Sequence, residues 1–266
     1  MTTGSDLDPR PDETLDVLFG ERIALLQARR GYRTSVDALV LAWAGATVAP
    51  ACAELRGLDL GCGVGLVGLL AAAALPGSHW SLVDVQPQQV ERAERNLRRN
   101  RVADRCVAYC ADIATAPPLG PFDLVLCNPP FRPLARHAPS ANRERQLSNC
   151  ESSATLERFV AVALAALAPG GHAVFVYPWA SRSRLLAAMA GAGAQVAACA
   201  VHHHPQAPPV RLVAVATRDL DVTLAGCLPE HLALHPADQP DSVHGLEICQ
   251  FLDRMAARGA ARQPKP

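Results

Sequence analysis

Short apolar segments alternate with helix-like segments from residue 55 to residue 218. The apolar segments have the length of strands, and glycine- and proline-rich turns punctuate the series. This alternation predicts an α/β fold with a seven-stranded, mostly parallel sheet and helices on both faces. The predicted strands cover residues 55–60, 79–85, 105–110, 122–127, 172–177, 195–202 and 210–218. The predicted helices cover residues 37–49, 66–74, 87–100, 154–168 and 181–192.

The connection before the last predicted strand indicates the direction of that strand. Residues 204–209 are rich in proline and too few to form a crossover helix. We therefore expect the last strand to run antiparallel to the strand before it. Ligands of such sheets bind beyond the carboxyl ends of the parallel strands, where we expect the functional residues.

The two ends of the chain differ in character from this regular region. Residues 1–13 are rich in Asp, Pro and Gly and are predicted to form a disordered leader, and residues 256–266 a disordered tail. Residues 14–255 are predicted to form a single domain. Within it, residues 15–27 predict a short strand or helix, and Ser35 or Asp37 is expected to cap the following helix.

The composition is typical of a compact globular protein without a membrane segment. Half of the residues are hydrophobic and 19% are charged, and the apolar runs are too short or too interrupted to span a bilayer. The polar, acidic N-terminus does not resemble a signal peptide, so a cytoplasmic protein is expected. The net charge is zero, so no global field favours a polyanion. We expect a monomer or weak dimer.

Cysteine and histidine are not arranged as metal ligands. The nine cysteines form no Cys-x-x-Cys pair, and buried reduced thiols are predicted for those in or beside the strands. These are Cys62, Cys106, Cys110, Cys127 and Cys199. Successive residues of a strand point to alternate faces, so residues 202–204 (His-His-His) cannot form a compact ligand set. The prediction is that the protein holds no metal.

A glycine-rich loop with an acidic start follows the first strand of the regular region. It reads Asp59-Leu60-Gly61-Cys62-Gly63-Val64-Gly65 and precedes a predicted helix. Its glycines allow a tight turn and close approach of the backbone to a ligand. The spacing differs from the dinucleotide pattern Gly-x-Gly-x-x-Gly, and Asp59 would repel a pyrophosphate. The alternative is a set of turn glycines that binds no ligand.

Two further acids follow the next two predicted strands. Asp84 is placed to accept both hydroxyls of a ribose, and Asp112 stands beside Ile113. With Asp59, these acids resemble the cofactor framework of class I methyltransferases, which implies a Rossmann-like fold and S-adenosyl-L-methionine as cofactor. The resemblance implies that the glycine loop lies against the methionine part and that Asp84 binds the ribose. It also implies that Asp112 contacts the adenine amine while Ile113 packs on the ring.

The motif Asn128-Pro129-Pro130-Phe131 directly follows the fourth predicted strand. An exocyclic base amine is a poor nucleophile because its lone pair is conjugated with the ring. The Asn128 side-chain carbonyl and the Pro129 backbone carbonyl could accept its two N–H bonds and favour pyramidalisation, and proline fixes these acceptors in advance. Phe131 offers a flat face for stacking a flipped-out base. A proline-rich loop without catalytic function is the alternative interpretation.

A second resemblance concerns residues 31–42, which read Gly-Tyr-Arg-Thr-Ser-Val-Asp-Ala-Leu-Val-Leu-Ala. They are similar to the first motif of the bacterial tRNA1(Val) (adenine-37-N6)-methyltransferase family. The similarity extends over about residues 15–218, and more loosely to Met255, and implies that residues 14–54 cover the cofactor. It runs through the glycine loop, Arg95-Asn96, Asn100, the Asn128–Phe131 motif, Ser140, Asn142, Arg143 and Cys150-Glu151.

The chain departs from this family at three positions. Asp84 stands where the family usually has glutamate, Phe131-Arg132-Pro133 has phenylalanine where tyrosine is often found, and Cys150 replaces a histidine. These departures leave methyl transfer secure and concern the substrate. Together the two resemblances imply a set of cofactor-binding residues: Arg33, Asp37, Asp59, Gly61, Gly63, Gly65, Asp84, Val85, Asp112, Ile113 and Asn128.

Arginines surround the predicted reaction motif. Arg132, Arg136, Arg143 and Arg145 follow it and are candidates for contacts with RNA phosphates, or else form a solvated loop. A second group is expected on the outer face of the helix at 87–100 and just beyond it: Arg92, Arg95, Arg98, Arg99, Arg101 and Arg105.

The predicted activity is transfer of a methyl group to the N6 amine of an adenine in tRNA. Three alternatives remain open. They are another planar amine in ribosomal RNA, DNA or a small molecule, a glutamine amide of a protein, and cofactor binding without catalysis. A glutamine enzyme would commonly carry a helical recognition domain, whereas fewer than about 55 residues precede the glycine loop here.

Overall fold

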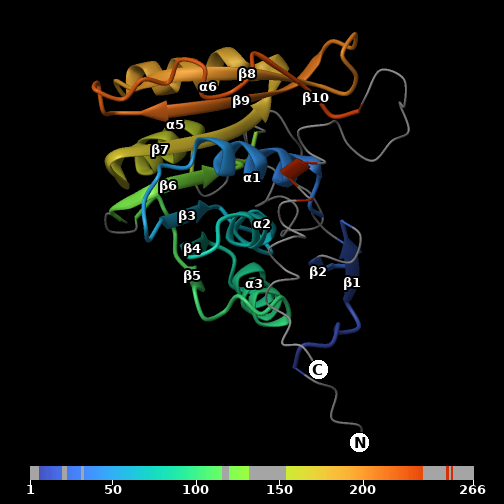
Figure 1. The fold of residues 1–266 in the computed structure, drawn as a ribbon. Helices are drawn as coiled ribbons and strands as arrows, with labels where there is room; N and C mark the ends of the chain where they lie inside the picture. Colours follow the sequence, from blue (N-terminus) through green and yellow to red (C-terminus); the bar gives the residue numbers. More distant parts are fainter. Residues whose placement is uncertain are drawn as a thin grey trace, which may run out of the picture.

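The computed structural model describes residues 6–19, 23–30, 33–115, 120–131, 154–235, 250–251 and 253. Its main feature is a sheet in the order β10-β8-β9-β7-β6-β3-β4-β5, stacked from top to bottom in Figure 1. The strands are β3 (Arg56–Leu60), β4 (His79–Asp84), β5 (Cys106–Cys110), β6 (Phe122–Cys127), β7 (Leu167–Pro178), β8 (Gln195–His202), β9 (Pro209–Thr217) and β10 (His231–Ala233).

The directions of the strands follow the prediction, but their number differs by one. β9 runs antiparallel to both β7 and β8, as the short connection before it indicated. The other pairs are parallel. The described sheet has eight strands instead of seven, because the three-residue β10 adds to the outer edge of β8. A segment this short carries too little periodicity to be recognised in the sequence.

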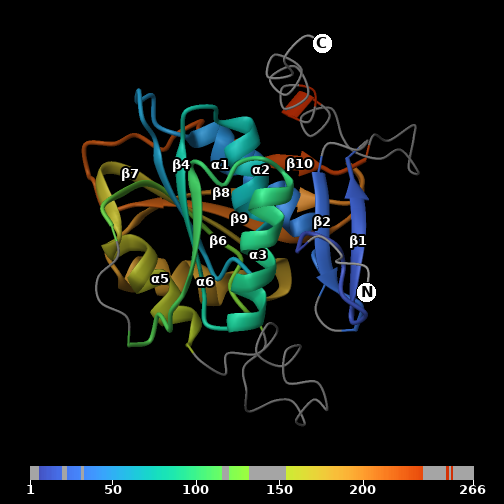
Figure 2. The same cartoon turned by 90° about the horizontal axis from the view of Figure 1, so that it is seen from below.

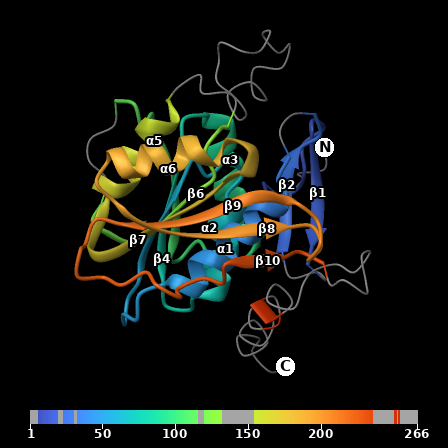
Figure 3. The same cartoon turned by 90° about the horizontal axis from the view of Figure 1, so that it is seen from above.

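Five α-helices cover the two faces of the sheet in the described residues. They are α1 (Val36–Val48), α2 (Leu66–Ala74), α3 (Pro87–Arg99), α5 (Leu156–Ala165) and α6 (Arg182–Gly191). Alternation along the strands divides the core: Leu124 and Leu126 face one cluster with α1, α2 and α3, whereas Val125 and Cys127 face the other with α5 and α6. Figure 3 shows α5 and α6 on one side of the sheet and α1 and α2 on the other.

The N-terminal residues form a separate antiparallel hairpin. β1 (Glu13–Leu18) pairs with β2 (Ile23–Ala28), where the sequence predicted a single short strand or helix. The hairpin stands beside α3 (Figure 2), on the side toward which β6 and β7 point in Figure 1. Residues 6–13, expected to belong to a disordered leader, lie against α3: the Arg95 Nε donates to the backbone oxygen of Asp6 at 2.8 Å.

The arginines of α3 do not all lie on an outer face. The side chain of Arg95 is fully buried and Arg92 is 5% exposed, and both donate to Glu13, itself 1% exposed. Arg105 is also buried and donates to the backbone oxygens of Ala72 and Ser78. The expectation of an outer helix face is wrong for these three residues. The N-terminal segment covers Arg92 and Arg95 on α3, whereas Arg105 lies beyond the end of α3 and is buried against the end of α2 and the turn that follows it.

The described cysteines form no disulfide bond. All seven cysteines in these residues are free, and Cys62, Cys106, Cys127 and Cys199 are buried. Cys110 is exposed on the edge strand β5, where the sequence predicted burial. Among the described helices, none combines the length and the hydropathy that a membrane crossing requires.

Candidate active site

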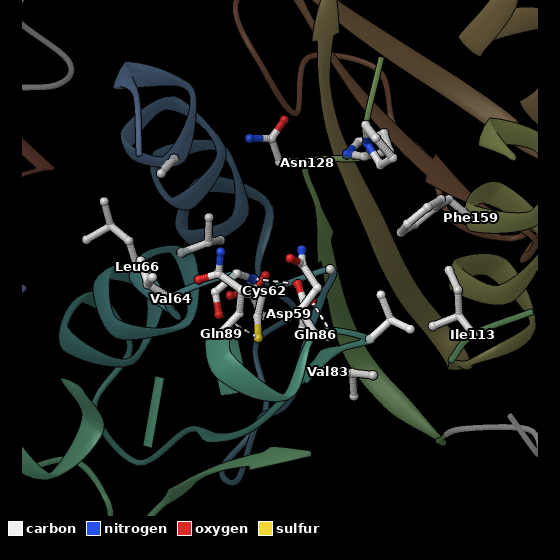
Figure 4. A pocket seen from close by; sticks show the side chains of 18 of the residues that line it. Asp59, Cys62, Val64, Leu66, Val83, Gln86, Gln89, Ile113, Asn128 and Phe159 are labelled. Carbon is white, nitrogen blue, oxygen red and sulfur yellow. Dashed lines mark hydrogen bonds between the residues drawn. The ribbon is translucent and has the colours of Figure 1, made fainter. Parts of the chain in front are cut away.

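A pocket opens beyond the carboxyl ends of β3, β4 and β6. Residues of α1 and α2 from one face of the sheet and of α5 from the other contribute to its lining. Its empty volume is about 1050 Å³, part of it open to solvent. Figure 4 shows Asp59 and Cys62 in its centre, Val64 and Leu66 on one side, and Phe159 and Ile113 on the other. The lining residues are Thr34, Ser35, Ala38, Asp59, Gly61, Cys62, Gly63, Val64, Leu66, Val67, Val83, Asp84, Val85, Gln86, Gln89, Ala111, Asp112, Ile113, Asn128, Pro129, Pro130, Phe131 and Phe159.

Two glycines of the loop between β3 and α2 explain why the pocket exists. Gly65 has φ +82° at the first residue before α2, and a Cβ there would lie 3.0 Å from a Leu82 methyl and 3.2 Å from the Ala93 Cβ. Gly63 also has positive φ, but an added Cβ would meet nothing within 4 Å. Gly65 therefore permits close packing of the loop on the core, whereas Gly63 leaves its backbone open toward the pocket.

Asp59 and Asp84 anchor this loop through backbone hydrogen bonds. An Asp59 oxygen accepts from the Gly68 N–H at 2.9 Å inside α2. The two Asp84 oxygens accept from the N–H groups of Gly63 and Gln86, each at 2.9 Å. Both carboxylates are buried, and neither forms an ion pair within the described residues.

Burial of these two acids changes their protonation. Removal from water raises the pKa of Asp59 to about 7, against the opposing hydrogen bond from Gly68, and the nearby Asp84 charge adds to the rise. Burial also raises the pKa of Asp84, although its backbone hydrogen bonds act in the opposite direction. A cation bound in the pocket would favour the ionised form of both groups and thereby lower their pKa values.

An apolar wall faces the two carboxylates across the pocket. Ile113 and Phe159 form this wall, and the Ile113 backbone oxygen accepts from the Arg158 Nε at 2.9 Å, which ties it to α5. Beside Ile113, an Asp112 oxygen accepts from the Ala114 N–H at 2.8 Å. A planar ring can lie against this wall with polar acceptors at its edge.

Sequence reasoning missed three prominent lining residues. Gln86 and Gln89 stand two and five residues after Asp84, at the N-cap and in the first turn of α3, and this place after a strand-end acid was a signal that could have identified them. Phe159 lies 46 residues beyond Ile113 on α5, and an added Cβ on Gly61 would come within 3.3 Å of its ring. No local pattern marks Phe159, because only the packing of α5 on the sheet brings it to the pocket.

The four residues of the motif after β6 all line the pocket. Asn128 follows Cys127, the last residue of β6, and lies on the opposite side of the pocket from Gln89 in Figure 4. Pro129 is buried, and Phe131 packs against the core cluster of α5 and α6. Asn128 and the two prolines follow the strand without a break, so β6 fixes the position of the Asn128 side chain and of the Pro129 backbone oxygen.

Three residues expected to bind the cofactor do not line the described pocket: Gly65, which packs on the core, Arg33 and Asp37. The Arg33 guanidinium forms an ion pair with Asp16 and donates to the Thr14 hydroxyl at 2.9 Å. Asp37 is buried in an ion pair with Arg211, with 2.9 Å between the Oδ1 and the Nε. Thr34 and Ser35 line the pocket instead, and Ser35 caps α1. Charge pairing between residues far apart in the chain, which the sequence cannot reveal, thus holds the side chains of Arg33 and Asp37.

Several predicted positions lie outside the described residues. Arg132, Arg136, Arg143 and Arg145 belong to the segment 132–153, and Gly31 and Tyr32 are also outside. In the part of the chain that is described, no group of three or more His, Cys, Asp or Glu side chains could hold a metal ion. His202 is buried and its two ring nitrogens contact Ala207 O and His231 Nδ1, at 2.6 and 3.0 Å.

The family profile of the methyltransferase small domain matches residues 46–197, which hold the glycine loop, the strand-end acids and Asn128. The chain belongs to this family. It is a class I S-adenosyl-L-methionine-dependent methyltransferase, as the three strand-end acids predicted, and the predicted cofactor is confirmed.

Curated relatives of this methyltransferase include two bacterial tRNA1(Val) (adenine(37)-N6)-methyltransferases. The one from Porphyromonas gingivalis is 30% identical over 61% of this chain and 65% of the relative. The one from Vibrio cholerae is 30% identical over 65% of this chain and 69% of the relative. The match thus spans about two thirds of these proteins.

A solved structure supports the fold independently. The crystal structure of a predicted O-methyltransferase from Agrobacterium tumefaciens has a TM-score of 0.60 to this methyltransferase, with 19% sequence identity. The alignment covers 82% of this chain and 96% of that chain. The Rossmann-like class I fold is therefore confirmed, apart from the number of strands.

The described residues fit S-adenosyl-L-methionine as the ligand of this pocket. The cofactor carries a positive sulfonium and an ammonium, and the pocket offers two buried carboxylates that form no ion pair within the described residues. It also carries a ribose and an adenine, which suit the Asp84 oxygens and the wall of Ile113 and Phe159. Gly63 leaves its backbone open for close approach.

Proposed function

We propose that this methyltransferase methylates the exocyclic N6 amine of an adenine in tRNA. The observation that carries the proposal is the position of Asn128: its motif forms one side of a pocket whose other parts fit the cofactor. An acceptor held by this motif would face the same space as the methyl donor. Positioning of this kind supplies much of the rate of a bimolecular transfer.

Four parts of the pocket would hold the cofactor. Asp84 would accept the ribose hydroxyls, since its two carboxylate oxygens offer about four acceptor sites and the backbone donors of Gly63, Val85 and Gln86 do not use all of them. Asp112 would contact the adenine amine, and Ile113 and Val85 would pack on the ring with Phe159. The glycine loop and Asp59 would lie against the methionine part. The cofactor supplies an electrophilic methyl group on a positive sulfur.

The motif residues would prepare the acceptor amine. The Asn128 side-chain oxygen and the Pro129 backbone oxygen would each accept one amine N–H, which draws the nitrogen lone pair out of conjugation with the ring. Because β6 and two prolines hold these oxygens, little reorganisation remains when charge develops on the nitrogen. Phe131 would stack on the base, and the amine proton leaves to water after the attack, so no strong general base is required.

The choice of adenine in tRNA rests on the relatives. Two curated relatives of about 30% identity carry the name tRNA1(Val) (adenine(37)-N6)-methyltransferase. Asn128 to Phe131 suits any planar amine, so the motif does not choose between adenine and other acceptors. The arginines at 132, 136, 143 and 145 remain predicted RNA contacts.

The acceptor can be identified by product analysis. The protein is incubated with methyl-labelled S-adenosyl-L-methionine and, separately, with tRNA, ribosomal RNA, DNA or protein from cells that lack the gene. We expect label in N6-methyladenosine of digested tRNA. If the label appears only in another pool, the tRNA acceptor is wrong while methyl transfer stands.

Replacement of Asn128 tests the proposed role of the motif. Asn128→Ala should lower kcat at least about 100-fold, since it removes one preorganised acceptor, and should leave the calorimetric Kd for S-adenosyl-L-methionine within about threefold of the wild type. Cys52→Ser, at an exposed position before β3 and outside the pocket lining, is the matched control and should change neither value. A large loss of cofactor affinity in Asn128→Ala would contradict the assignment to the acceptor.

A further inference from the structure

An aromatic–arginine pair stands at the end of β7, next to the strand that carries the reaction motif. The 3₁₀ turn η2 (Trp179–Ser181) follows β7 directly and leads into α6. The guanidinium carbon of Arg182 lies 4.4 Å from the centroid of the Trp179 ring, and its Nη1 donates to the Trp179 backbone oxygen at 3.1 Å. Stacking and hydrogen bonding therefore hold an otherwise flexible arginine in one place.

Strand register places this pair near the proposed acceptor. Cys127 of β6 lies opposite Phe175 of β7, and the two strands are parallel. Asn128 is one residue beyond this level and Trp179 is four residues beyond it on the neighbouring strand. Three residue steps and one strand spacing correspond to about 11 Å between the two backbones. A nucleotide next to a base held at Asn128 can cover this distance.

Trp179 shares its support with the stacking residue of the motif. Both Trp179 and Phe131 are half-buried and pack against the core cluster of α5 and α6. Two aromatic side chains thus stand on one rigid base: Phe131, which lines the pocket after β6, and Trp179, which follows β7. Such a base is preorganised and needs no ordering when a ligand binds.

The charge of Arg182 is available, in contrast to that of its neighbours. Within the described residues no carboxylate lies within 4 Å of its guanidinium, and its side chain is exposed. Arg184, two residues further along α6, forms two hydrogen bonds of 3.1 Å with Glu157. Arg211, opposite Pro178 on β9, forms an ion pair with Asp37. A single oriented positive charge therefore marks this part of the rim.

We propose that Arg182, held by Trp179, binds the phosphate of a nucleotide that adjoins the methylated base. The proposal rests on the proposed function and adds to it a contact with the flanking strand. Enzymes that act on flipped-out bases commonly take part of their selectivity from neighbouring nucleotides. Guanidinium N–H groups that do not face the indole ring can donate to phosphate oxygens. The contact positions the RNA and reads no base.

The test compares four variants on tRNA and on a short acceptor. Arg182→Ala and Arg182→Lys change the proposed contact, Trp179→Phe weakens its ordering while keeping the packing, and Arg184→Ala is the matched control on the same helix. KM and kcat for tRNA are measured at several salt concentrations, and thermal melting confirms folding. Adenosine serves as the short acceptor because it has no flanking phosphate.

A phosphate contact gives a distinctive pattern. Arg182→Ala should raise KM for tRNA about tenfold with unchanged kcat, and should reduce the slope of log(1/KM) against log[salt] by about 1. Arg182→Lys should have a KM for tRNA lower than that of Arg182→Ala but above that of the wild type. Trp179→Phe should have a KM between those of Arg182→Lys and the wild type. Activity on adenosine and the Kd for S-adenosyl-L-methionine should be the same in all variants.

The outcomes separate the two proposals. If the wild type methylates tRNA and Arg182→Ala behaves like Arg184→Ala in KM and salt slope, the phosphate contact is overturned and the proposed function stands. If Arg182→Ala lowers activity on adenosine equally, the residue acts through the fold and the contact is again overturned. If the wild type methylates no RNA, the proposed function fails, and this inference fails with it.

Discussion

The buried carboxylates of the N-terminal hairpin and those of the pocket are held in opposite ways. Glu13, in the N-terminal hairpin, accepts hydrogen bonds from two buried arginines of α3. Asp59 and Asp84, in the pocket, accept hydrogen bonds from backbone N–H groups of the glycine loop and α2. All three side chains are nearly inaccessible to water.

The pKa values record this difference. Burial acts to raise the pKa of Glu13, but hydrogen bonds from the Arg10 backbone, Arg95 and Arg92 outweigh it and the pKa is lowered. Burial raises the pKa values of Asp59 and Asp84, since within the described residues no cation lies beside them. The negative charge of Glu13 is compensated by arginines of the protein itself, whereas the carboxyl groups of Asp59 and Asp84 remain available to a ligand.

The largest effect is expected from breaking the hairpin side of this comparison. Glu13→Ala would remove the buried carboxylate that Arg95 contacts at 2.9 Å and leave it, among the described carboxylates, only the longer contact with Glu91 at 3.7 Å, which should lower the free energy of unfolding by about 3–5 kcal/mol. Asp6→Ala removes the exposed partner of Arg98 and should cost less than about 1 kcal/mol. Urea denaturation followed by circular dichroism measures both. Equal losses would show that the buried pair contributes no more than the exposed one.

Breaking the pocket side should affect cofactor binding more than folding. Asp84→Asn would remove the charge and turn one acceptor into a donor, so the Kd for S-adenosyl-L-methionine should rise about 100-fold, measured by calorimetry. The matched variant Asp123→Asn changes a carboxylate at the start of β6, which accepts from the Arg56 N–H, and should leave the Kd unchanged. An unaltered Kd in Asp84→Asn would remove this residue from the cofactor site.

Stability against pH provides a third comparison. Between pH 5 and pH 7 Asp59 is protonated in the folded state, whose pKa is about 7, but ionised in the unfolded chain. Folding therefore binds a proton in this window, and the contribution of Asp59 to stability falls by about 2 kcal/mol as pH rises from 5 to 7. The contribution levels off about one pH unit above the folded-state pKa. Glu13, with its lowered pKa, contributes stability that is lost only at more acidic pH.

The control for this pH dependence is Asp59→Asn, which cannot titrate and keeps an acceptor for the Gly68 N–H. Denaturation curves of the cofactor-free protein are recorded at pH 5, 6, 7 and 8. The difference in stability between wild type and variant should change across pH 5–7 and then level off. If the stabilities of wild type and variant change with pH in the same way, Asp59 does not titrate in this range.

The smallest effect concerns the link between the two regions. The Asn96 amide bonds to the backbone of Leu26 in β2 through both its oxygen and its nitrogen, and the nitrogen also donates to the Val64 oxygen of the glycine loop at 2.9 Å. Asn100 makes the same paired contact with Ala24 but does not bond the glycine loop. Asn96 thus connects the hairpin to the cofactor pocket.

Alanine variants of the two asparagines separate the two roles. Both should lower the melting temperature, because each leaves backbone groups of β2 without a partner. Only Asn96→Ala should also weaken S-adenosyl-L-methionine binding, about fivefold, equivalent to about 1 kcal/mol. Equal Kd values for Asn96→Ala and Asn100→Ala would show that the hairpin and the pocket are independent.

Local sequence was sufficient for the parts of the site that follow strands directly. Asp59, Asp84, Asp112 and Asn128 each stand at or just beyond the end of a parallel strand, and the structure brings all four to one pocket. Their convergence was predictable because parallel strands place their carboxyl ends at the same edge of a sheet. The order of strands and helices, and the antiparallel β9, followed from segment length and connection length.

Tertiary structure decided the contacts between residues that are far apart along the chain. The sequence indicates neither that Glu13 meets Arg95 nor that Asp37 meets Arg211, 174 residues away. It also gives no sign that Phe159 faces Ile113 or that β10 joins β8. Such contacts depend on how whole elements pack. The strand-end residues of the pocket could therefore be predicted from local pattern, whereas the residues that hold and enclose them could not.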